Sequence, residues 1–394
     1  MLITLAIANY RSLLNITAPL GQLNVITGPN GSGKSNLYRS LRLLADSAQG
    51  GVINALAREG GLPSTFWAGP ESISKQMKKG EIPIRGTARS KPKRLRLGFA
   101  DSDFGYAISL GLPPPPDAEN PNPTKFLLDP EIKQESIWAG EAYRPASLLV
   151  DRHGGVVKIR DGRKWHVVEQ HLSPFESIFN HFSDPVSTPE ILALRARIQG
   201  WRFYDHFRTD ETASPRLPQL GTRTPVLSHD GSDLAAALQT IVEIGDQQAL
   251  NEAVGDAFPG AYIEIDDNSE ARFSIKLYQH GLLRPLSGAE LSDGAIRYLL
   301  WIAALLTPRP PPLMVLNEPE TSLHPDLLPA LARLIISASE RTQVWVVSHA
   351  ARLIAALEQY QNCHTIRLEK DCGATQIVDQ GLLDTPLWRW PDKG

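Results

Sequence analysis

Eight consecutive residues near the N-terminus constrain the fold of this chain more than any others: Gly28-Pro29-Asn30-Gly31-Ser32-Gly33-Lys34-Ser35. They follow an apolar segment, 23–27, that we expect to be a strand, and they lead into 34–48, where leucines recur at helical spacing. Between a strand and a helix, the spacing G-x-x-x-x-G-K-S is typical of a phosphate-binding loop. Glycines allow the tight turn, and the loop N–H groups then point at phosphate oxygens.

The loop predicts a site for ATP with a bound Mg²⁺ ion. Lys34 can reach the β- and γ-phosphates, and the Ser35 hydroxyl can ligate the metal. The other residues expected to bind the nucleotide are Gly28, Pro29, Asn30, Gly31, Ser32, Gly33 and Asn36. A plain glycine turn is the structural alternative, but it does not account for Lys-Ser at this position.

The composition is that of a soluble globular protein. A net charge of −3 over 394 residues excludes a general polycationic surface, so any nucleic-acid contact must be local. The two cysteines fit a reducing compartment and exclude a disulfide framework. The most apolar run, 299–306, is too short to cross a bilayer, and the first expected strand leaves no room for a signal peptide. We therefore expect a cytoplasmic protein with no membrane partner.

The pattern along the chain divides it into three regions. Residues 1–61 and 231–394 alternate strand and helix signals, and we expect them to form an α/β P-loop head with a mixed or parallel sheet flanked by helices. Residues 62–230 lose this alternation and predict an inserted antiparallel β and helical subdomain. Its expected strands are 94–99, 106–110, 124–128, 147–150, 156–159 and 165–168, and its expected helices are 175–182 and 189–199.

A second polar site is expected where the apolar strand 313–316 ends. Glu318 follows it, at the edge that faces the phosphate loop in a doubly wound sheet, and its carboxylate can orient or deprotonate an attacking water. Asn317 can accept from a metal-bound water, but it lacks the negative charge usual at this position, so turnover can be slow. A strand end followed by a turn at Pro319 is the structural alternative.

Two further stretches are candidates for binding the γ-phosphate once the phosphate loop and the Glu318 strand end are taken into account. Ser292, Asp293 and Gly294 begin an apolar helix, with Ser292 as its expected N-cap, and a helix N-terminus can bind the γ-phosphate held by another subunit. His349 follows the strand expected at 344–347 and can bond the γ-phosphate or the attacking water. Alone, each is ordinary, since many helices begin with a serine cap and most histidines after strands are structural.

Together, Gly28–Ser35, Leu291–Ala295, Leu316–Glu320 and Ser348-His349 resemble the ABC-type ATPases of the RecF/SMC class. The similarity is greatest to stand-alone RecF-like predicted AAA-type ATPases related to the OLD family, which Ile7–Leu13 and Asp230–Leu234 also resemble. The resemblance implies that Lys34 and Ser35 belong to Walker A, Asn317 and Glu318 to Walker B, Ser292–Gly294 to a signature acting in trans, Thr321–His324 to the D-loop, and His349 to the switch histidine. It also implies an ATP-dependent homodimer that separates after hydrolysis.

The chain departs from this class in several places. Asn317 replaces the usual aspartate, and Asp293 replaces the glycine common in transporter signatures. No Q-loop glutamine can be assigned, and Gln76 and the stretch 66–69 are candidates for the position of this loop. Without sustained heptads we expect no long coiled-coil arms, and the residues after His349 are too few for the Toprim nuclease of OLD proteins.

A basic stretch, Lys75–Arg96, is the one local candidate for contact with DNA. It carries nine basic residues against one acid, Glu81, and a solvated loop is the alternative reading. The basic residues are Lys75, Lys78, Lys79, Arg85, Arg89, Lys91, Lys93, Arg94 and Arg96. The histidines of the middle third have no metal-ligand spacing and are expected to be ordinary: His153, His166, His171, His181 and His206.

Three functions remain open on the sequence. The resemblance favours an ATP-hydrolysing dimerisation switch in DNA repair, double-strand break repair, recombination or genome maintenance. A second possibility is the sensor subunit of an antiphage system that regulates a separate effector protein. A third is the ATPase subunit of a transporter, against which the Asn-Glu strand end and the RecF-like segments argue.

Overall fold

The computed structural model describes residues 1–70, 74–78, 93–114, 124–267, 270–381 and 384–391. The chain divides into two compact units. Unit 1 consists of Met1–Gly21, Gly28–Gly200 and Ile366–Gly394, and unit 2 consists of Gln22–Thr27 and Trp201–Thr365. The basic residues Lys79, Arg85, Arg89 and Lys91, with Glu81, lie outside the described residues. The boundaries expected at 61 and 230 stay a prediction.

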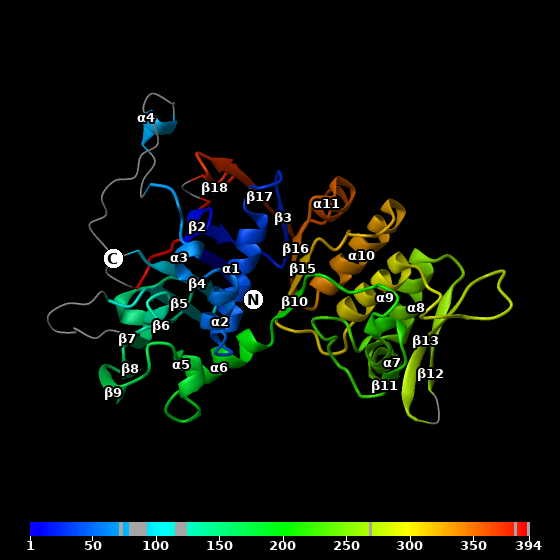
Figure 1. Ribbon diagram of the computed structural model, residues 1–394, viewed down its shortest axis with the longest axis horizontal. Coiled ribbons are helices and arrows are strands. Elements are labelled where there is room, and N and C mark those ends of the chain that lie inside the picture. The colour runs from blue at the N-terminus through cyan, green and yellow to red at the C-terminus, as the bar shows by residue number, and fades with distance from the viewer. Residues whose placement is uncertain (71–73, 79–92, 115–123, 268–269, 382–383, 392–394) are drawn as a thin grey trace. The chain divides into compact units, whose positions relative to one another are not determined.

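Unit 1 contains an eight-stranded antiparallel sheet in the order β2-β1-β4-β5-β6-β7-β8-β9 (Figure 1). The strands are β1 (Leu2–Tyr10), β2 (Leu13–Pro19), β4 (Leu95–Asp101), β5 (Phe104–Gly111), β6 (Glu131–Ala139), β7 (Leu148–His153), β8 (Val156–Asp161) and β9 (Lys164–Glu169). The first two strands of the chain therefore share a sheet with those of the middle third. This sheet confirms the antiparallel β structure expected there.

Within unit 1, one strand prediction is wrong, and one strand was not predicted. Residues 124–128 form a turn, and the apolar side chains of 126–128 are exposed to solvent, so no sheet pairs with them. Strand β6 lies just beyond and pairs with β5 and β7. Its alternation is hidden in the sequence because Gln134, Glu135 and Ser136 are polar yet buried. A buried polar group needs partners, and these come from distant segments.

The partners of Glu135 form a closed polar network under the sheet. Arg152 Nη1 lies 2.6 Å from Glu135 Oε2, and both side chains are fully buried. The hydroxyls of Tyr106 and Ser177 donate to the same carboxylate at 2.9 and 2.6 Å, and the Ile178 N–H donates at 3.0 Å. Burial raises the pKa of the Tyr106 hydroxyl well above its usual range. Because every carboxylate oxygen is satisfied, the charge of Glu135 is tolerated in the core.

The helices of unit 1 are short except for the one that follows the phosphate loop. They are α1 (Lys34–Ser47), α2 (Val52–Arg58), α3 (Leu62–Thr65), α4 (Lys75–Lys78), α5 (Ile178–His181) and α6 (Pro189–Gln199), with 3₁₀ turn η1 (Pro145–Ser147). Helix α5 occupies only the end of the helix expected at 175–182. A hairpin of β17 (Cys363–Asp371) and β18 (Ala374–Ile377) follows near the C-terminus.

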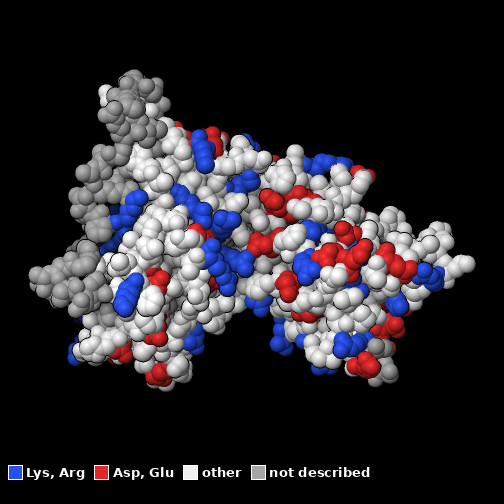
Figure 2. Space-filling view, viewed as in Figure 1, with Lys and Arg blue, Asp and Glu red and all other residues white. Residues whose placement is uncertain are grey.

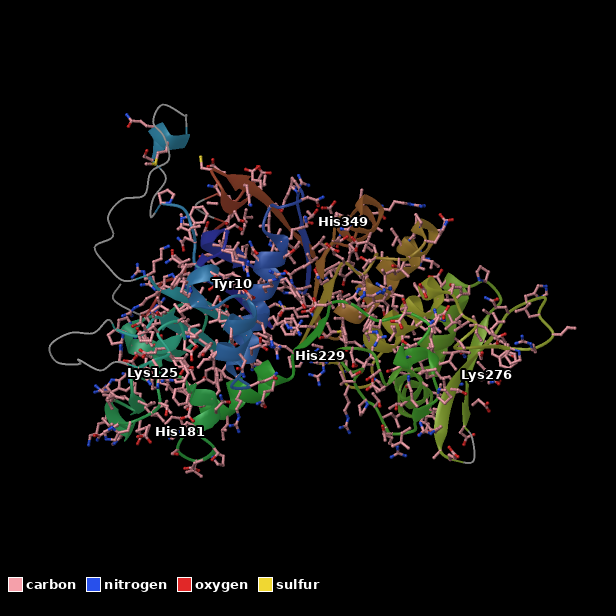
Figure 3. All side chains as sticks on the ribbon, in the orientation of Figure 1. Tyr10, Lys125, His181, His229, Lys276 and His349 are labelled. Carbon is pink, nitrogen blue, oxygen red and sulfur yellow. The ribbon has the colours of Figure 1, made fainter. Side chains whose placement is uncertain are left out.

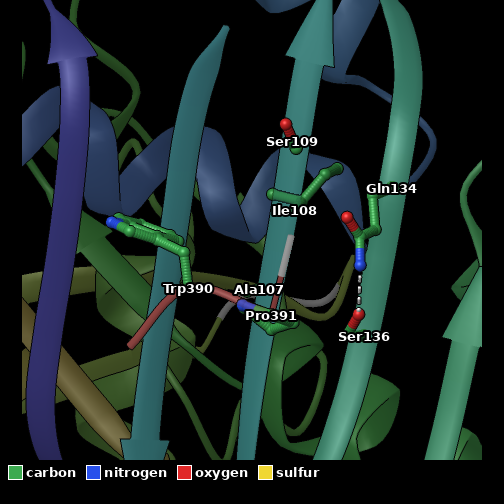
Figure 4. A pocket seen from close by; sticks show the side chains of 7 residues that line it. All are labelled: Ala107, Ile108, Ser109, Gln134, Ser136, Trp390 and Pro391. Atoms are coloured by element: carbon green, nitrogen blue, oxygen red, sulfur yellow. Dashed lines mark hydrogen bonds between the residues drawn. The ribbon is translucent and has the colours of Figure 1, made fainter. Parts of the chain in front are cut away.

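The C-terminal segment packs on the antiparallel sheet of unit 1. Trp388 lies over Gly98, where a Cβ atom would approach its ring to 2.6 Å, and it packs edge-on against Trp138 with ring centroids 5.5 Å apart. Trp390 and Pro391 line a small hollow of about 10 Å³ with residues of β5 and β6, including Gln134, whose Nε2 lies 3.2 Å from Ser136 Oγ (Figure 4). A space of this size holds no more than a water molecule.

Unit 2 contains a parallel sheet and a small antiparallel sheet. The parallel order is β10-β15-β16-β3, with β10 (Arg202–Tyr204), β15 (Leu313–Asn317), β16 (Gln343–Val347) and β3 (Leu23–Thr27). The antiparallel sheet has β11 (Gln219–Leu220), β12 (Tyr262–Asp267), β13 (Arg272–Tyr278) and β14 (Leu286–Ser287). The parallel strands are almost wholly apolar and buried, as expected for a sheet covered by helices.

Five helices pack in unit 2, in addition to the 3₁₀ turns η2 (Ser214–Arg216) and η3 (Pro325–Leu327). They are α7 (Leu234–Ile244), α8 (Gln247–Ala257), α9 (Asp293–Leu305), α10 (Leu328–Ser339) and α11 (Ala351–Glu358). Helix α9 is buried along its length from Ala295 onward, so its apolar run is a core element of the unit. No helix in the described part of the chain is long and apolar enough to cross a membrane.

Candidate functional site

The phosphate-binding loop in unit 1 has a backbone that requires its glycines. Gly28, Gly31 and Gly33 have φ angles of 148°, 77° and 111°. A Cβ atom at Gly28 would lie 2.2 Å from the Leu368 carbonyl oxygen, and one at Gly33 would lie 2.2 Å from Thr375 Oγ1. Gly31 faces open space. The loop is therefore packed against the β17–β18 hairpin on one side and open on the other.

Lys34 is folded back over this loop. Its Nζ atom donates to the carbonyl oxygens of Gly28 and Pro29 at 2.7 and 3.1 Å. The Ser32 hydroxyl is buried and has no hydrogen-bond partner among the described residues. An ammonium group and an unpaired hydroxyl at a helix N-terminus are suited to phosphate oxygens, so the residues present fit the triphosphate of ATP. Ser35 is exposed at the start of α1.

A chain of hydrogen bonds holds the loop from behind. Asn36 Nδ2 donates to Ser12 Oγ at 2.8 Å, and Ser12 Oγ lies 2.7 Å from Thr375 Oγ1. Thr375 Oγ1 in turn donates to the Ser32 carbonyl oxygen at 2.8 Å. Asn36, expected to bind nucleotide, thus supports the loop through Ser12. Sequence analysis missed Thr375, because nothing near it indicates that it contacts a loop so far away in the chain.

In unit 2, Glu318 and His349 come together at the carboxyl edge of the parallel sheet. Asn317, half-buried, pairs in register with Val347, and the Glu318 N–H donates to the Val347 carbonyl at 2.8 Å. His349 follows β16 at the same edge (Figure 3). Its Nδ1 lies 3.8 Å from Glu318 Oε1. Both side chains are about half exposed, so both are available to a ligand. Strand β3 also ends at this edge, where its Ile26 pairs with Val347. Gly28, the first residue of the phosphate loop, lies two positions after Ile26 in the sequence.

Glu318 has an unusual backbone conformation. Its φ angle is 49°, in the left-handed region that residues other than glycine seldom adopt. Such strain persists only where the surrounding structure imposes it, and it is frequent at functional sites. Here the hydrogen bond to Val347 and the packing of the next residues fix the turn.

Glu320, to which sequence analysis gave no role, ties this turn to the turn after β16. Its Oε1 atom accepts from Ser348 Oγ at 2.7 Å, from the His349 N–H at 3.0 Å and from the Ala350 N–H at 3.1 Å. It also lies 3.3 Å from His349 Nδ1. The carboxylate therefore satisfies the free N–H groups at the start of α11, where a negative charge is favourable.

Replacing Glu320 by alanine is expected to lower the free energy of unfolding by about 1–3 kcal/mol, because three donors lose a buried acceptor. Urea denaturation of the purified variants measures this. Glu318→Ala is the matched control, since that side chain is half exposed and its loss should change stability by less than about 0.5 kcal/mol. Equal stability of the two variants would contradict the role given to Glu320.

The expected signature motif forms the beginning of α9. Ser292 caps the helix, its Oγ accepting from the Ala295 N–H at 3.2 Å. Asp293 is the first residue of the helix, and its Oδ1 lies 2.5 Å from Arg216 Nη2. A Cβ atom at Gly294 would lie 3.2 Å from the Ser322 carbonyl oxygen, so the helix start approaches the segment expected as the D-loop.

A cavity of about 680 Å³ lies beside this helix start, within unit 2. Ser292, Gly294 and Ala295 line one side, and residues 322–327 with Phe258 line the other. The predicted signature and D-loop residues are thus neighbours in space. Both are reachable from solvent, because the cavity is open.

The remaining candidates for functional residues have weaker structural support. Lys93 Nζ donates to the Trp67 carbonyl at 2.8 Å and lies over the Phe66 ring, so one predicted DNA-contacting residue instead holds the segment named as a Q-loop candidate. Among the described residues there is no cluster of three His, Cys, Asp or Glu suited to a metal ion. Cys363 and Cys372 are not joined by a disulfide bond. The face in view carries both positive and negative side chains (Figure 2).

The fold is similar to that of SMC heads. One solved structure, an SMC head bound to the C-terminal winged-helix domain of ScpA, is 14% identical, with 96% of each chain covered and a TM-score of 0.51. Another, an SMC head with a coiled coil and joint from Pyrococcus yayanosii, is 10% identical, with 98% of each chain covered and a TM-score of 0.50. No curated protein matches the chain.

The fold and the loop together define an α/β P-loop ATPase whose fold is similar to that of SMC heads. Within that class, the chain belongs to the family described as "AAA domain, putative AbiEii toxin, Type IV TA system", whose model matches residues 23–355. The matched range spans the phosphate loop, the signature segment, the Asn317-Glu318 strand end and His349. The α/β P-loop fold expected from the sequence is confirmed.

Proposed function

We propose that this protein is an ATP-hydrolysing switch that dimerises when ATP is bound. The observation that carries the proposal is the phosphate loop, in which Lys34 and the unpaired Ser32 hydroxyl are placed for phosphate oxygens at the start of α1. Glu318 with His349 at 3.8 Å supplies a carboxylate–imidazole pair suited to an attacking water.

Each residue has a separate task in this proposal. Lys34 leaves the carbonyls of Gly28 and Pro29 and binds the β- and γ-phosphates. Ser35 and Asn317 would hold Mg²⁺, which when bound neutralises phosphate charge. Glu318 orients the water or accepts its proton, and His349 bonds the γ-phosphate or that water. Because Asn317 contributes no charge to the metal site, we expect slow turnover.

The partner subunit completes the site. Ser292, Asp293 and Gly294 of one copy would face the γ-phosphate bound by the other, since a helix N-terminus beside an open cavity is suited to an anion. Ser322, Leu323 and His324 line the same cavity, and the D-loop segment 321–324 would contact the second copy. Hydrolysis removes the γ-phosphate and with it the charge that holds the two copies together.

By resemblance to RecF-like and OLD-family ATPases, the switch would act in DNA repair, recombination or genome maintenance in the cytoplasm. ATPase activity measured with and without single-stranded, duplex and gapped DNA, at two salt concentrations, tests this role. We expect DNA to stimulate turnover, and neutralising Lys91, Arg94 and Arg96 to abolish the stimulation. ATPase activity that is the same with and without DNA would contradict the role in DNA repair.

One observation favours a second candidate function. The family's description names a putative toxin of a type IV toxin–antitoxin system, which fits an ATPase sensor subunit of a defence system better than a repair enzyme. In that case ATP binding would regulate a separate effector protein. A co-purifying effector, together with ATPase activity indifferent to DNA, would support this alternative.

A further inference from the structure

We infer that Arg216 is a positioning residue for the signature segment: it holds the loop before α9 in place and neutralises Asp293, so that an anion can approach Ser292. This inference rests on the proposed function, because it explains how this chain presents Ser292 to the γ-phosphate of a partner subunit. No sequence pattern indicates a role for Arg216, which lies in the 3₁₀ turn η2, far from α9 in the chain.

The contacts of Arg216 centre on the signature segment. Its Nη1 donates to the Gly288 carbonyl at 3.1 Å and to the Leu291 carbonyl at 2.5 Å, and its Nη2 donates to Asp293 Oδ1 at 2.5 Å. Its Nε donates to the Thr209 carbonyl at 2.8 Å, which anchors the guanidinium at the other end. One side chain thus binds the residue before Ser292 and the residue after it.

The negative charge of Asp293 would oppose phosphate binding at this helix start unless a cation neutralised it. A carboxylate in the first turn stabilises the helix, but it also repels a phosphate that approaches the same N-terminus. The Asp293 side chain is 63% exposed, so its charge faces the solvent from which the phosphate would come, whereas the Arg216 side chain is only 6% exposed. A buried guanidinium in contact with the carboxylate cancels the repulsion without blocking the approach.

A second guanidinium lies near the same carboxylate. Burial lowers the pKa of Arg297, one turn along α9, and the negative charge of Asp293 offsets part of this shift. Arg297 Nη2 donates to the Phe207 carbonyl at 3.0 Å, so this side chain is directed to the core of unit 2. Asp293 therefore sits beside two cations, but only Arg216 both contacts it and holds the backbone around Ser292.

The same segment of chain offers a matched control. Arg208 pairs with Asp210 at 2.9 Å, as close as many strong ion pairs, but both side chains are largely exposed and neither contacts α9. An exposed pair contributes little. Arg208→Gln therefore removes a similar charge from the same segment without touching the signature segment, and we expect no change in dimerisation.

Sedimentation velocity at a series of protein concentrations, with Mg-ATP and in the Glu318→Gln background, tests the inference. We expect Arg216→Gln to weaken ATP-dependent dimerisation about 10-fold or more and Asp293→Asn to strengthen it about 3-fold. The double variant Arg216→Gln/Asp293→Asn should dimerise at least about 10-fold more tightly than Arg216→Gln, a larger gain than the about 3-fold that Asp293→Asn gives in the parent, because the unpaired charge is gone. ATP binding by the monomer should be unchanged throughout.

A gain of only about 3-fold from Asp293→Asn in the Arg216→Gln background, which is the additive result, would overturn the inference, since Arg216 would then not act on the charge of Asp293. Arg216→Lys keeps the positive charge, so its ATP-dependent dimerisation should be weakened less than that of Arg216→Gln. It can be measured in place of Arg216→Gln if the glutamine variant does not fold. Weaker dimerisation by Asp293→Asn alone would also contradict the inference. If the parent protein binds ATP but does not dimerise, the proposed function is contradicted. That outcome is distinct from one in which the parent dimerises and only the role given to Arg216 is contradicted.

Discussion

Replacing Lys34 by alanine abolishes ATP binding in our account, with an affinity at least about 100-fold lower than that of the wild type. The ammonium group is the one cation in the phosphate loop, and charge-assisted bonds to phosphate are among the strongest polar contacts. A 100-fold loss corresponds to about 2.8 kcal/mol. Titration of a fluorescent ATP analogue, or calorimetry with ATP and Mg²⁺, measures the dissociation constant directly.

The control for Lys34→Ala is Arg39→Ala. Arg39 lies on the exposed face of α1, so its removal takes away one positive charge from the same helix without changing the loop. We expect ATP affinity to change less than about 2-fold. If Lys34→Ala binds ATP as tightly as Arg39→Ala does, the loop is not the ATP site.

Glu318→Gln is expected to lower the rate of ATP hydrolysis by about 10²–10⁴-fold while leaving ATP affinity within about 3-fold of the wild type. The amide keeps the size of the side chain but cannot accept a proton from water. Because the Glu318 backbone is already held in its left-handed conformation by the bond to Val347, the change should leave the turn intact. Single-turnover release of phosphate measures the chemical step apart from binding.

Glu340→Gln is the control for this variant, because Glu340 is an exposed carboxylate at the end of α10. Its turnover should equal that of the wild type. Hydrolysis by Glu318→Gln at the wild-type rate would remove Glu318 from the reaction and point to another base, with His349 the nearest alternative.

The parts of the site that lie in one short stretch of sequence could be predicted. The phosphate loop, the apolar strand before Asn317-Glu318 and the Ser292 cap each depend on neighbours within a few residues. Their secondary structure follows the predicted bounds closely: β3 is Leu23–Thr27 and α9 is Asp293–Leu305. Local patterns of this kind are strong because the backbone conformation and the side chains that need it are adjacent.

The supporting residues could not be predicted, because each acts across a long stretch of chain. Thr375 holds the Ser32 carbonyl, Glu320 binds the start of α11, and Arg216 contacts Asp293. A threonine, a glutamate or an arginine has no pattern that indicates its distant partner. Strand β6 was missed for the same reason, since Glu135 is buried only because Arg152 and Tyr106 reach it.

In the proposed switch, ATP brings two copies of this chain together through Ser292. Sedimentation velocity of Glu318→Gln with and without Mg-ATP tests it most directly, because this variant should hold ATP without hydrolysing it. We predict a dimer with ATP, a monomer without it, and a monomer in both conditions for Glu318→Gln/Lys34→Ala. A Glu318→Gln protein that is saturated with ATP and remains monomeric would contradict the account.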